Sequence, residues 1–423
     1  MRTVGLIVEY NPLHHGHVYH FQQSKHVTGA ERVIAVMSGH FLQRGEPALV
    51  SKWARTEMAL KMGVDLVIEL PVAFAVQPAE WFAYGAVSAL EATGITDAIC
   101  FGSEHGSLDS LQQMASLLAN EPEHFQHRLQ QQLKAGIAYP AAYAAAAADC
   151  FTEQTLTSVD DPALGAAETA ANAAWMAQPN NSLGLHYLIA LQRLSSPIQP
   201  YTIQRQKADY HQQTITDTRI ASATAIRKLL QQGNWSDARA YFPAFVWDIL
   251  QREVREGRGL MEWERFYSPL MHLLHALPVE ALSTFQEVSE GLEHRIKQQL
   301  PSYEGNTVQG FVEKLKTRRY TWTKIQRMLL RILLQHHKHA LAPPLLAQGV
   351  PYLRILGFSR QGRDMLKEMK KTARVPVILQ GGRESNAMLE MDIRASAVYA
   401  HAYPESQSAK TGYRDYFAPP LQE

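Results

Sequence analysis

The residues of this sequence best suited to chemistry lie in the loop YNPLHHGH, at positions 10–17. His14, Gly16 and His17 stand between an apolar run typical of a buried strand (residues 4–8) and a segment of helical spacing. Backbone amides at a helix N-terminus and the helix dipole favour an anion, and a glycine lets a ligand come close to the backbone. The pattern therefore predicts a phosphate-binding loop, with a nucleotide as its natural ligand.

The loop fits the pattern [TN]-P-x-H-x-G-H of the HIGH-type nucleotidyltransferases. The longer strings GLIVEYNPLHHGHVYH, MSGHFLQRGEPALVSKWARTEMAL, CFGSE, PNNSLG, IASATAIR and LEMDIRASAVYA resemble the bacterial tRNA(Met) cytidine acetate ligases over nearly the whole chain. The resemblance implies an ATP-dependent tRNA-modifying ligase that forms acetyl-adenylate from acetate and ATP. The acetyl group would then pass to the wobble cytidine of elongator tRNA(Met), giving N4-acetylcytidine.

The segment IASATAIR, at positions 220–227, resembles the ISSTxIR element of small adenylyltransferases, which binds the β- and γ-phosphates. Ser222 and Thr224 offer hydroxyls at a predicted helix start, and Arg227 provides a charged fork for phosphate. Alone, the segment would favour an ordinary helix N-cap with a solvent-facing arginine. Paired with the histidine loop, it predicts adenylyl transfer, in which catalysis rests on in-line positioning and on stabilising charge at phosphate.

We expect the catalytic groups to be His14, His17 and Ser222. The expected ATP-binding residues come from these motifs and from the family resemblance: Ile7, Asn11, His14, Gly16, His17, His20, Gly102, Asn180, Arg205, Ser222, Thr224 and Arg227. Gly102 would let the backbone approach the adenosine, Asn180 would hydrogen-bond ribose or base, and Arg205 would reach phosphate or base. Glycine and asparagine are also common turn residues, which is the alternative for the first two.

Three further cations follow the second predicted strand, in the stretch SGHFLQRGEPALVSKWAR: Arg44, Lys52 and Arg55. Lys52 and Arg55 are three residues apart on one predicted helix and so share a face. They would clamp an acyl carboxylate or the triphosphate. A solvated helix face is an equally good interpretation.

ATP is the expected co-substrate, and Mg²⁺ would arrive with it. No protein metal site is expected, because the cluster His336, His337 and His339 has no evident acidic or cysteine partner and fits a basic helix end. The sequence contains neither the P-loop string GxxxxGK[ST] nor a complete GxGxxG fingerprint. The sequence therefore gives no motif evidence for a P-loop or dinucleotide-binding function.

Composition narrows the class of protein. A chain of 423 residues exceeds what one core usually serves, so two or three domains are expected. The formal net charge of +1 gives no global signal for nucleic acid, so such a site must be a local patch. Two cysteines exclude a disulfide framework and fit a reducing cytoplasm. The absence of a signal peptide or a long apolar run predicts a cytoplasmic protein with no membrane contact.

Short apolar runs alternate with helical patterns in the first half of the chain. This alternation predicts a doubly wound, Rossmann-like parallel α/β fold for a nucleotidyltransferase domain at residues 1–236. Its strands are expected at residues 4–8, 33–37, 66–70, 98–101 and 198–203, and its helices at 18–26, 51–62 and 79–93, with further helices between 108 and 178. From residue 237 to 423 strand signals nearly vanish, apart from an apolar run at 375–379, which predicts a mainly α-helical region.

This C-terminal region carries two basic stretches. The first has no acidic residue from 314 to 338 and is interleaved with Tyr320 and Trp322, and the second spans 354–374. Lysine and arginine neutralise backbone phosphates and aromatic rings stack on unpaired bases, so we expect tRNA binding there. The residues assigned to it are Lys316, Arg318, Arg319, Lys324, Arg327, Arg363, Lys370 and Lys371. A solvated charged face is the alternative for each stretch.

Two other functions remain open from the residues alone. The same fold serves small-molecule adenylyltransferases, although the long C-terminal region would then have no task. A non-catalytic tRNA-binding protein with a relic nucleotide fold is the other alternative. Acetate specificity follows only from the resemblance, and the sequence does not determine anticodon recognition or oligomeric state.

Overall fold

The computed structural model of the protein describes residues 1–104, 106–155, 171–176, 178–204, 222–383, 385–405 and 408–423. Within these residues an eight-stranded sheet runs in the order β5-β4-β1-β2-β3-β6-β7, with β8 beside β6. The strands are β1 (Thr3–Val8), β2 (Arg32–Ser38), β3 (Leu66–Leu70), β4 (Ala98–Ser103), β5 (Gln199–Gln204), β6 (Leu353–Phe358), β7 (Val377–Ile378) and β8 (Leu421–Gln422). Neighbouring strands among β1 to β5 are parallel.

The central strands are apolar on both faces because helices cover both faces. Ile34 and Val36 of β2 belong to one core cluster, whereas Val33 and Ala35 belong to the other. Successive side chains of a strand point to opposite faces, so a continuous apolar run is what a doubly covered strand requires. The five strands predicted in the first half of the chain and the parallel α/β fold are confirmed.

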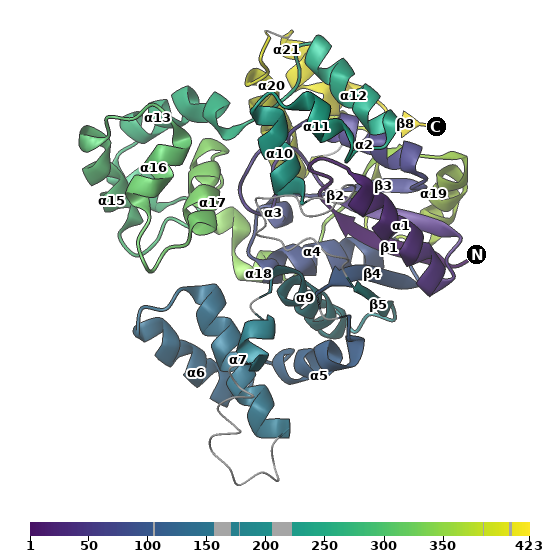
Figure 1. Ribbon diagram of the computed structural model, residues 1–423, viewed down its shortest axis with the longest axis horizontal. Helices are drawn as coiled ribbons and strands as arrows, with labels where there is room; N and C mark the ends of the chain where they lie inside the picture. Colours follow the sequence, from purple (N-terminus) through teal and green to yellow (C-terminus); the bar gives the residue numbers. More distant parts are fainter. Residues whose placement is uncertain (105, 156–170, 177, 205–221, 384, 406–407) are drawn as a thin grey trace.

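The helices connect and cover the strands (Figure 1). They are α1 (His15–Thr28), α2 (Lys52–Met62), α3 (Val72–Ala75), α4 (Ala79–Ala92), α5 (Leu108–Leu118), α6 (Glu123–Lys134), α7 (Tyr139–Thr155), α9 (Pro179–Arg193), α10 (Ala223–Gln231), α11 (Trp235–Arg239), α12 (Ala244–Arg255), α13 (Tyr267–Ala276), α14 (Val279–Ser283), α15 (Leu292–Gln299), α16 (Val308–Leu315), α17 (Trp322–Leu333), α18 (Pro343–Leu346), α19 (Arg360–Thr372), α20 (Ala387–His401), α21 (Ala409–Gly412) and α22 (Arg414–Phe417). Helix α1 begins three residues before the predicted start at residue 18, because the histidine loop itself caps it. None of the described helices is long and apolar enough to cross a membrane.

The strand β6 was not predicted. It pairs antiparallel with β3, so the sheet takes strands from both sides of the division at residue 236. Its sequence, LRILGF, contains a charge and a glycine, which weaken a strand signal. Arg354 is nevertheless fully buried there, opposite Glu69 of β3. The apolar run predicted at 375–379 forms only the two-residue strand β7.

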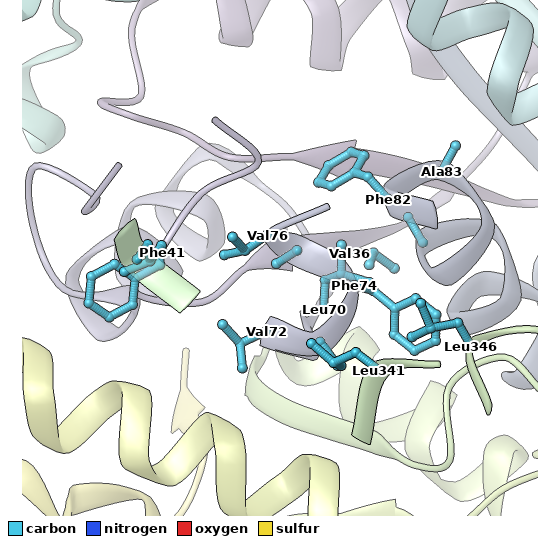
Figure 2. Close-up of a cluster of buried hydrophobic side chains, with 14 of the residues drawn as sticks. Val36, Phe41, Leu70, Val72, Phe74, Val76, Phe82, Ala83, Leu341 and Leu346 are labelled. Carbon is cyan, nitrogen blue, oxygen red and sulfur yellow. The ribbon is translucent and has the colours of Figure 1, made fainter. Parts of the chain in front are cut away.

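The C-terminal half is mainly helical, as predicted, and its helices α13 to α17 gather in one lobe beside the sheet (Figure 1). A shared core joins this half to the N-terminal half. Figure 2 shows Leu341 and Leu346 in one buried cluster with Leu70 and Phe74. Burying such side chains stabilises a fold by about 1.5–3 kcal/mol each, so the two halves support one another.

Candidate nucleotide-binding site

A cavity of about 290 Å³ opens at the carboxyl ends of β1 and β4, at the place where a parallel α/β sheet usually binds ligands. The cavity is lined by all the predicted nucleotide-binding residues that fall within the described part of the chain: Ile7, Asn11, His14, Gly16, His17, His20, Gly102, Asn180, Ser222, Thr224 and Arg227. Arg205 lies outside the described residues. The two motifs, about two hundred residues apart in sequence, thus meet in one cavity.

The histidine loop forms the N-terminal cap of α1. The backbone N–H of Gly16 donates to His14 Nδ1 at 3.0 Å, and the backbone N–H of His14 donates to His17 Nδ1 at 3.2 Å. A nitrogen that accepts from an amide carries no proton, so a neutral ring at either position holds its proton on Nε2. The cap therefore fixes both rings as Nε2–H donors, the form that suits an anionic oxygen.

The second motif begins α10 in the same way. Ser222 is the N-cap, and its Oγ accepts from the backbone N–H of Ala225 at 3.2 Å. The N-termini of α1 and α10 thus both contribute to the cavity, through His14, Gly16 and Ser222. Two helix dipoles with their positive ends at one site make it electrically suited to a polyphosphate.

Arg227 joins the two motifs. Its Nη1 donates to the backbone carbonyl of Asn11 at 2.8 Å, and its Nη2 lies 3.3 Å from Glu46 Oε1. Asn11 is held from the other side, since its Oδ1 accepts from the backbone N–H of Leu49 at 2.7 Å. Within the described part of the chain, Asn11 Nδ2 is a buried donor without a partner. A donor left unsatisfied on a cavity wall is suited to a ligand oxygen.

The other end of the cavity is formed by β4, α9 and β5, and its walls are more apolar. Phe101 and Tyr187, whose ring centroids are 5.6 Å apart, contribute here together with Gly102. Asn180 is fixed by a carboxylate, because its backbone N–H and its Nδ2 both donate to Glu104 Oε1, at 3.1 and 2.5 Å. Glu104 belongs to the CFGSE string, but nothing in the sequence pattern indicated that it organises the start of α9.

Glu9 is a cavity residue that the sequence pattern did not reveal. It lies directly after β1, and its Oε1 accepts from the backbone N–H of Gln43 at 2.8 Å and from Ser38 Oγ at 3.2 Å. Burial raises the pKa of this carboxyl, and the nearby Glu46 raises it further. A carboxylate at the end of an otherwise apolar strand, in GLIVEYN, was the signal available in the sequence.

The three cations predicted for substrate have different surroundings. Arg44 lines the cavity. Lys52 and Arg55 are completely buried and are not among the described residues that line it. Lys52 Nζ contacts Glu69 at 2.7 Å and Asp415 at 2.8 Å. The solvated helix face proposed as the alternative for these two cations is therefore wrong.

The guanidinium of Arg55 is occupied by hydrogen bonds to backbone carbonyls. It donates to the carbonyls of Glu9 at 2.7 Å and Ser38 at 3.0 Å, and also to that of Gly39. These carbonyls belong to the segments that follow β1 and β2. Arg55 therefore ties together the two strand ends that carry the cavity loops.

The residues predicted for tRNA occupy two separate places. Lys316, Arg318 and Arg319 are exposed in the connection between α16 and α17, and Lys324 lies over the ring of Tyr320. Arg327 is largely enclosed and pairs with Glu287 at 2.8 Å. The other three, Arg363, Lys370 and Lys371, are exposed on α19, on the opposite side of the molecule (Figure 1).

The prediction that His336, His337 and His339 form a basic helix end is wrong for His336. His336 is fully buried, with Nδ1 2.9 Å from Nη1 of Arg331, and burial lowers the pKa of its imidazole. His337 stacks on Phe285 and His339 is exposed. Across the described ranges, no three His, Cys, Asp or Glu side chains are grouped so that they could hold a metal ion.

The whole chain is similar to known proteins. Residues 1–414 match the model of the HIGH Nucleotidyl Transferase family. The chain is 40% identical to the tRNA(Met) cytidine acetate ligase of Acetivibrio thermocellus, over 97% of this chain and 98% of that protein, and 38% identical to that of Bacillus subtilis, over 100% and 97%. The crystal structure of Thermotoga maritima TmcAL bound with alpha-thio ATP superposes with a TM-score of 0.89 at 32% identity, covering 100% of this chain and 99% of that one.

Proposed function

The chain belongs to the tRNA(Met) cytidine acetate ligase family of HIGH nucleotidyl transferases, and on this premise we propose that it is an ATP-dependent ligase acetylating the wobble cytidine of elongator tRNA(Met). Acetate attacks the α-phosphate of ATP, pyrophosphate leaves, and the acetyl-adenylate passes its acetyl group to the cytidine amine. The observation that carries this proposal is the meeting of the α1 and α10 N-termini at one cavity.

The cavity residues take roles that follow from their fixed geometry. His14 and His17 donate from Nε2 to the phosphate oxygens, because their Nδ1 atoms are occupied by the helix cap. Ser222 and the α10 N-terminus hold the β- and γ-phosphates, and the apolar end around Phe101 and Gly102 receives the adenosine. With the nucleotide held at both ends, the α-phosphate is presented for in-line attack.

Arg44 is the cavity cation that suits the acetate carboxylate, because Lys52 and Arg55 are enclosed elsewhere. Mg²⁺ would enter with ATP. Hydroxyl oxygens of the kind that it accepts as ligands lie on the cavity wall in Ser222 and Thr224. When bound, the ion would neutralise charge on the leaving pyrophosphate.

The tRNA contacts the connection between α16 and α17 rather than α19. The α17 helix packs against the cavity loop, since Gln326 Nε2 donates to the carbonyl of Arg44 at 3.1 Å. The end of α19 instead contacts the segment before β4, where Thr372 Oγ1 donates to the carbonyl of Thr93 at 3.0 Å. That contact lies at the amino-terminal edge of the parallel strands, opposite the cavity. We place the enzyme in the cytoplasm, in keeping with its two free buried cysteines.

The direct test incubates the protein with labelled acetate, ATP and tRNA(Met) and measures N4-acetylcytidine. Product is expected only when all three substrates are present, and its complete absence would refute the function. For the tRNA surface, Lys316→Glu with Arg318→Glu should weaken tRNA binding about tenfold or more and make its salt dependence shallower. The matched control on the other basic surface, Lys370→Glu with Lys371→Glu, should bind tRNA as the parent protein does.

A further inference from the structure

Acetyl transfer to a cytosine amine needs a proton acceptor. The lone pair of this amine is delocalised into the ring, so the nitrogen is a weak nucleophile, and its proton must leave as the new C–N bond forms. A positioned base contributes about 10²–10⁴ in rate to such a step. His14 and His17 are N–H donors under the cap geometry described above, so neither of these two rings is suited to act as the base.

Glu9 is a carboxylate on the cavity wall. Its carboxylate is anchored at the end of β2 by Gln43 and Ser38, which is the side of the histidine loop away from Phe101 and Gly102. The apolar side suits the nucleoside of ATP, so the side with Glu9 and Arg44 is left for the acyl group and its acceptor. Both hydrogen bonds to the Glu9 carboxylate fall on Oε1, and Oε2 takes part in neither.

The other ionisable groups around Glu9 are less suited to the task. Glu46 forms an ion pair with Arg227, with Oε1 3.3 Å from Nη2. Burial raises the pKa of Tyr10 and of Tyr187 above the usual range, so both remain phenols. Arg55, from α2, opposes the rise in the pKa of Glu9 that burial and Glu46 produce. The net effect is a raised pKa, and a carboxylate with a raised pKa is a stronger base than an ordinary one.

We propose that Glu9 is the general base of the acetyl-transfer step, acting through Oε2 on the exocyclic amine of the acceptor cytidine. The amine nitrogen forms a bond to the acetyl carbonyl carbon, and Glu9 takes the proton of the amine. The bond between the carbonyl carbon and the phosphate oxygen then breaks, and AMP leaves as the anion. This proposal rests on the proposed ligase function.

The test separates the two half-reactions. Glu9→Gln is close in shape and retains an acceptor oxygen for Gln43, so acetate-dependent exchange of pyrophosphate into ATP should stay within about threefold of the parent. Transfer from preformed acetyl-adenylate to tRNA(Met), measured in a single turnover, should fall about 10²–10⁴-fold. In the parent enzyme the transfer rate should rise with pH through the pKa of Glu9, and in Glu9→Gln this rise should disappear.

Two further variants guard against a purely structural effect. Ser38→Ala removes one of the two bonds that orient the carboxylate, so it should lower transfer about tenfold and leave exchange unchanged. Glu9→Asp should retain the pH dependence at a reduced rate. Equal loss of exchange and transfer in Glu9→Gln, or undiminished transfer, would overturn the role of Glu9. If the parent protein itself showed neither exchange nor acetylation, the ligase function would fail instead.

Discussion

Two groups of charged side chains lie at the same edge of the sheet, but one lines an open cavity and the other is buried in the fold. At the ends of β1 and β4, the nucleotide cavity keeps His14, His17 and Arg227 on the wall of an open space. At the end of β3, beside β6, the residues Lys52, Glu69, Arg354 and Asp415 form a buried ion cluster that is almost completely closed to solvent.

What differs between the two regions is the covering element. The C-terminal helix α22 places Asp415 over the end of β3, where its carboxylate lies 2.8 Å from Lys52 Nζ and 3.6 Å from Arg354 Nη2. Burial alone would raise the pKa of Asp415, yet these two cations hold it at about 2. Over β1 and β4, α10 presents its N-terminus instead and leaves room for a ligand. The same residue types thus stabilise the fold where the chain covers them and are available for chemistry where it does not.

Lys52→Met gives the largest expected effect and tests whether the buried ion cluster is structural. Removing Lys52 leaves Glu69 buried without its ion-pair partner and leaves Asp415 with the more distant Arg354 alone, which should lower the free energy of unfolding by about 3–5 kcal/mol. Denaturant unfolding measures this loss. Adding Glu69→Gln to Lys52→Met should recover part of it. A stable Lys52→Met protein with lost activity would make Lys52 a substrate group and remove the contrast.

His14→Asn sharpens the comparison from the cavity side. Asparagine is a good N-cap, so the start of α1 and the free energy of unfolding should be preserved, while the Nε2–H donor is lost. We expect kcat for acetylation to fall about 10²–10³-fold, equivalent to about 3–4 kcal/mol. His14→Ala should lose the same activity and in addition about 1 kcal/mol of stability. Unchanged activity in the double variant His14→Ala with His17→Ala would favour a non-catalytic tRNA-binding protein.

Asp415 of the buried ion cluster should contribute to the loss of stability in acid. The folded pKa of Asp415 is about 2, below the value of about 3.9 expected in the unfolded chain, so its stabilising effect is complete above pH 4 and is lost as the pH falls towards 2. The expected loss is on the order of 2–3 kcal/mol. Burial raises the pKa values of Glu69 and Asp392, so their contribution to the pH dependence has the opposite sign, and it is common to the parent protein and to a variant at Asp415.

The measurement is the free energy of unfolding at successive pH values from 5 to 2. Asp415→Asn is the matched variant, because the amide cannot titrate. Its unfolding free energy should be lower at neutral pH and should change less between pH 4 and 2. An identical pH dependence in the two proteins would contradict the assignment.

Arg227→Gln should have the smallest effect on the fold. The Arg227 side chain is partly exposed, and its contact with Glu46 is of a kind that contributes at most about 1 kcal/mol. Its loss removes a phosphate donor from the cavity, so we expect ATP to bind about 10- to 100-fold more weakly. Titration with a nonhydrolysable ATP analogue measures this affinity, and thermal unfolding supplies the stability control. Destabilisation as large as that of Lys52→Met would show that both cations are structural.

Much of the cavity could be predicted because its signals are local. The histidine loop, the cap at Ser222 and the apolar strands are each encoded by neighbouring residues, through helix capping and strand burial. Local patterns also carried the family resemblance. Sequence-based prediction failed where interacting residues come from distant segments. The strand β6 contains a buried arginine, Arg354, whose ion-pair partner Asp415 lies sixty-one residues later in the chain. No periodicity indicates such a pair.

The sequence by itself determined the parallel α/β fold, the phosphate loop and the pairing of the two nucleotide motifs, because capping, burial and motif spacing depend on residues close in the chain. Only the tertiary structure decided which cations remain available. Lys52 and Arg44 both belong to the segment SGHFLQRGEPALVSKWAR. Packing of α22 nevertheless encloses Lys52, whereas Arg44 lies on the cavity wall. Burial and ion pairing depend on what covers a side chain, and that is settled only when distant segments come together.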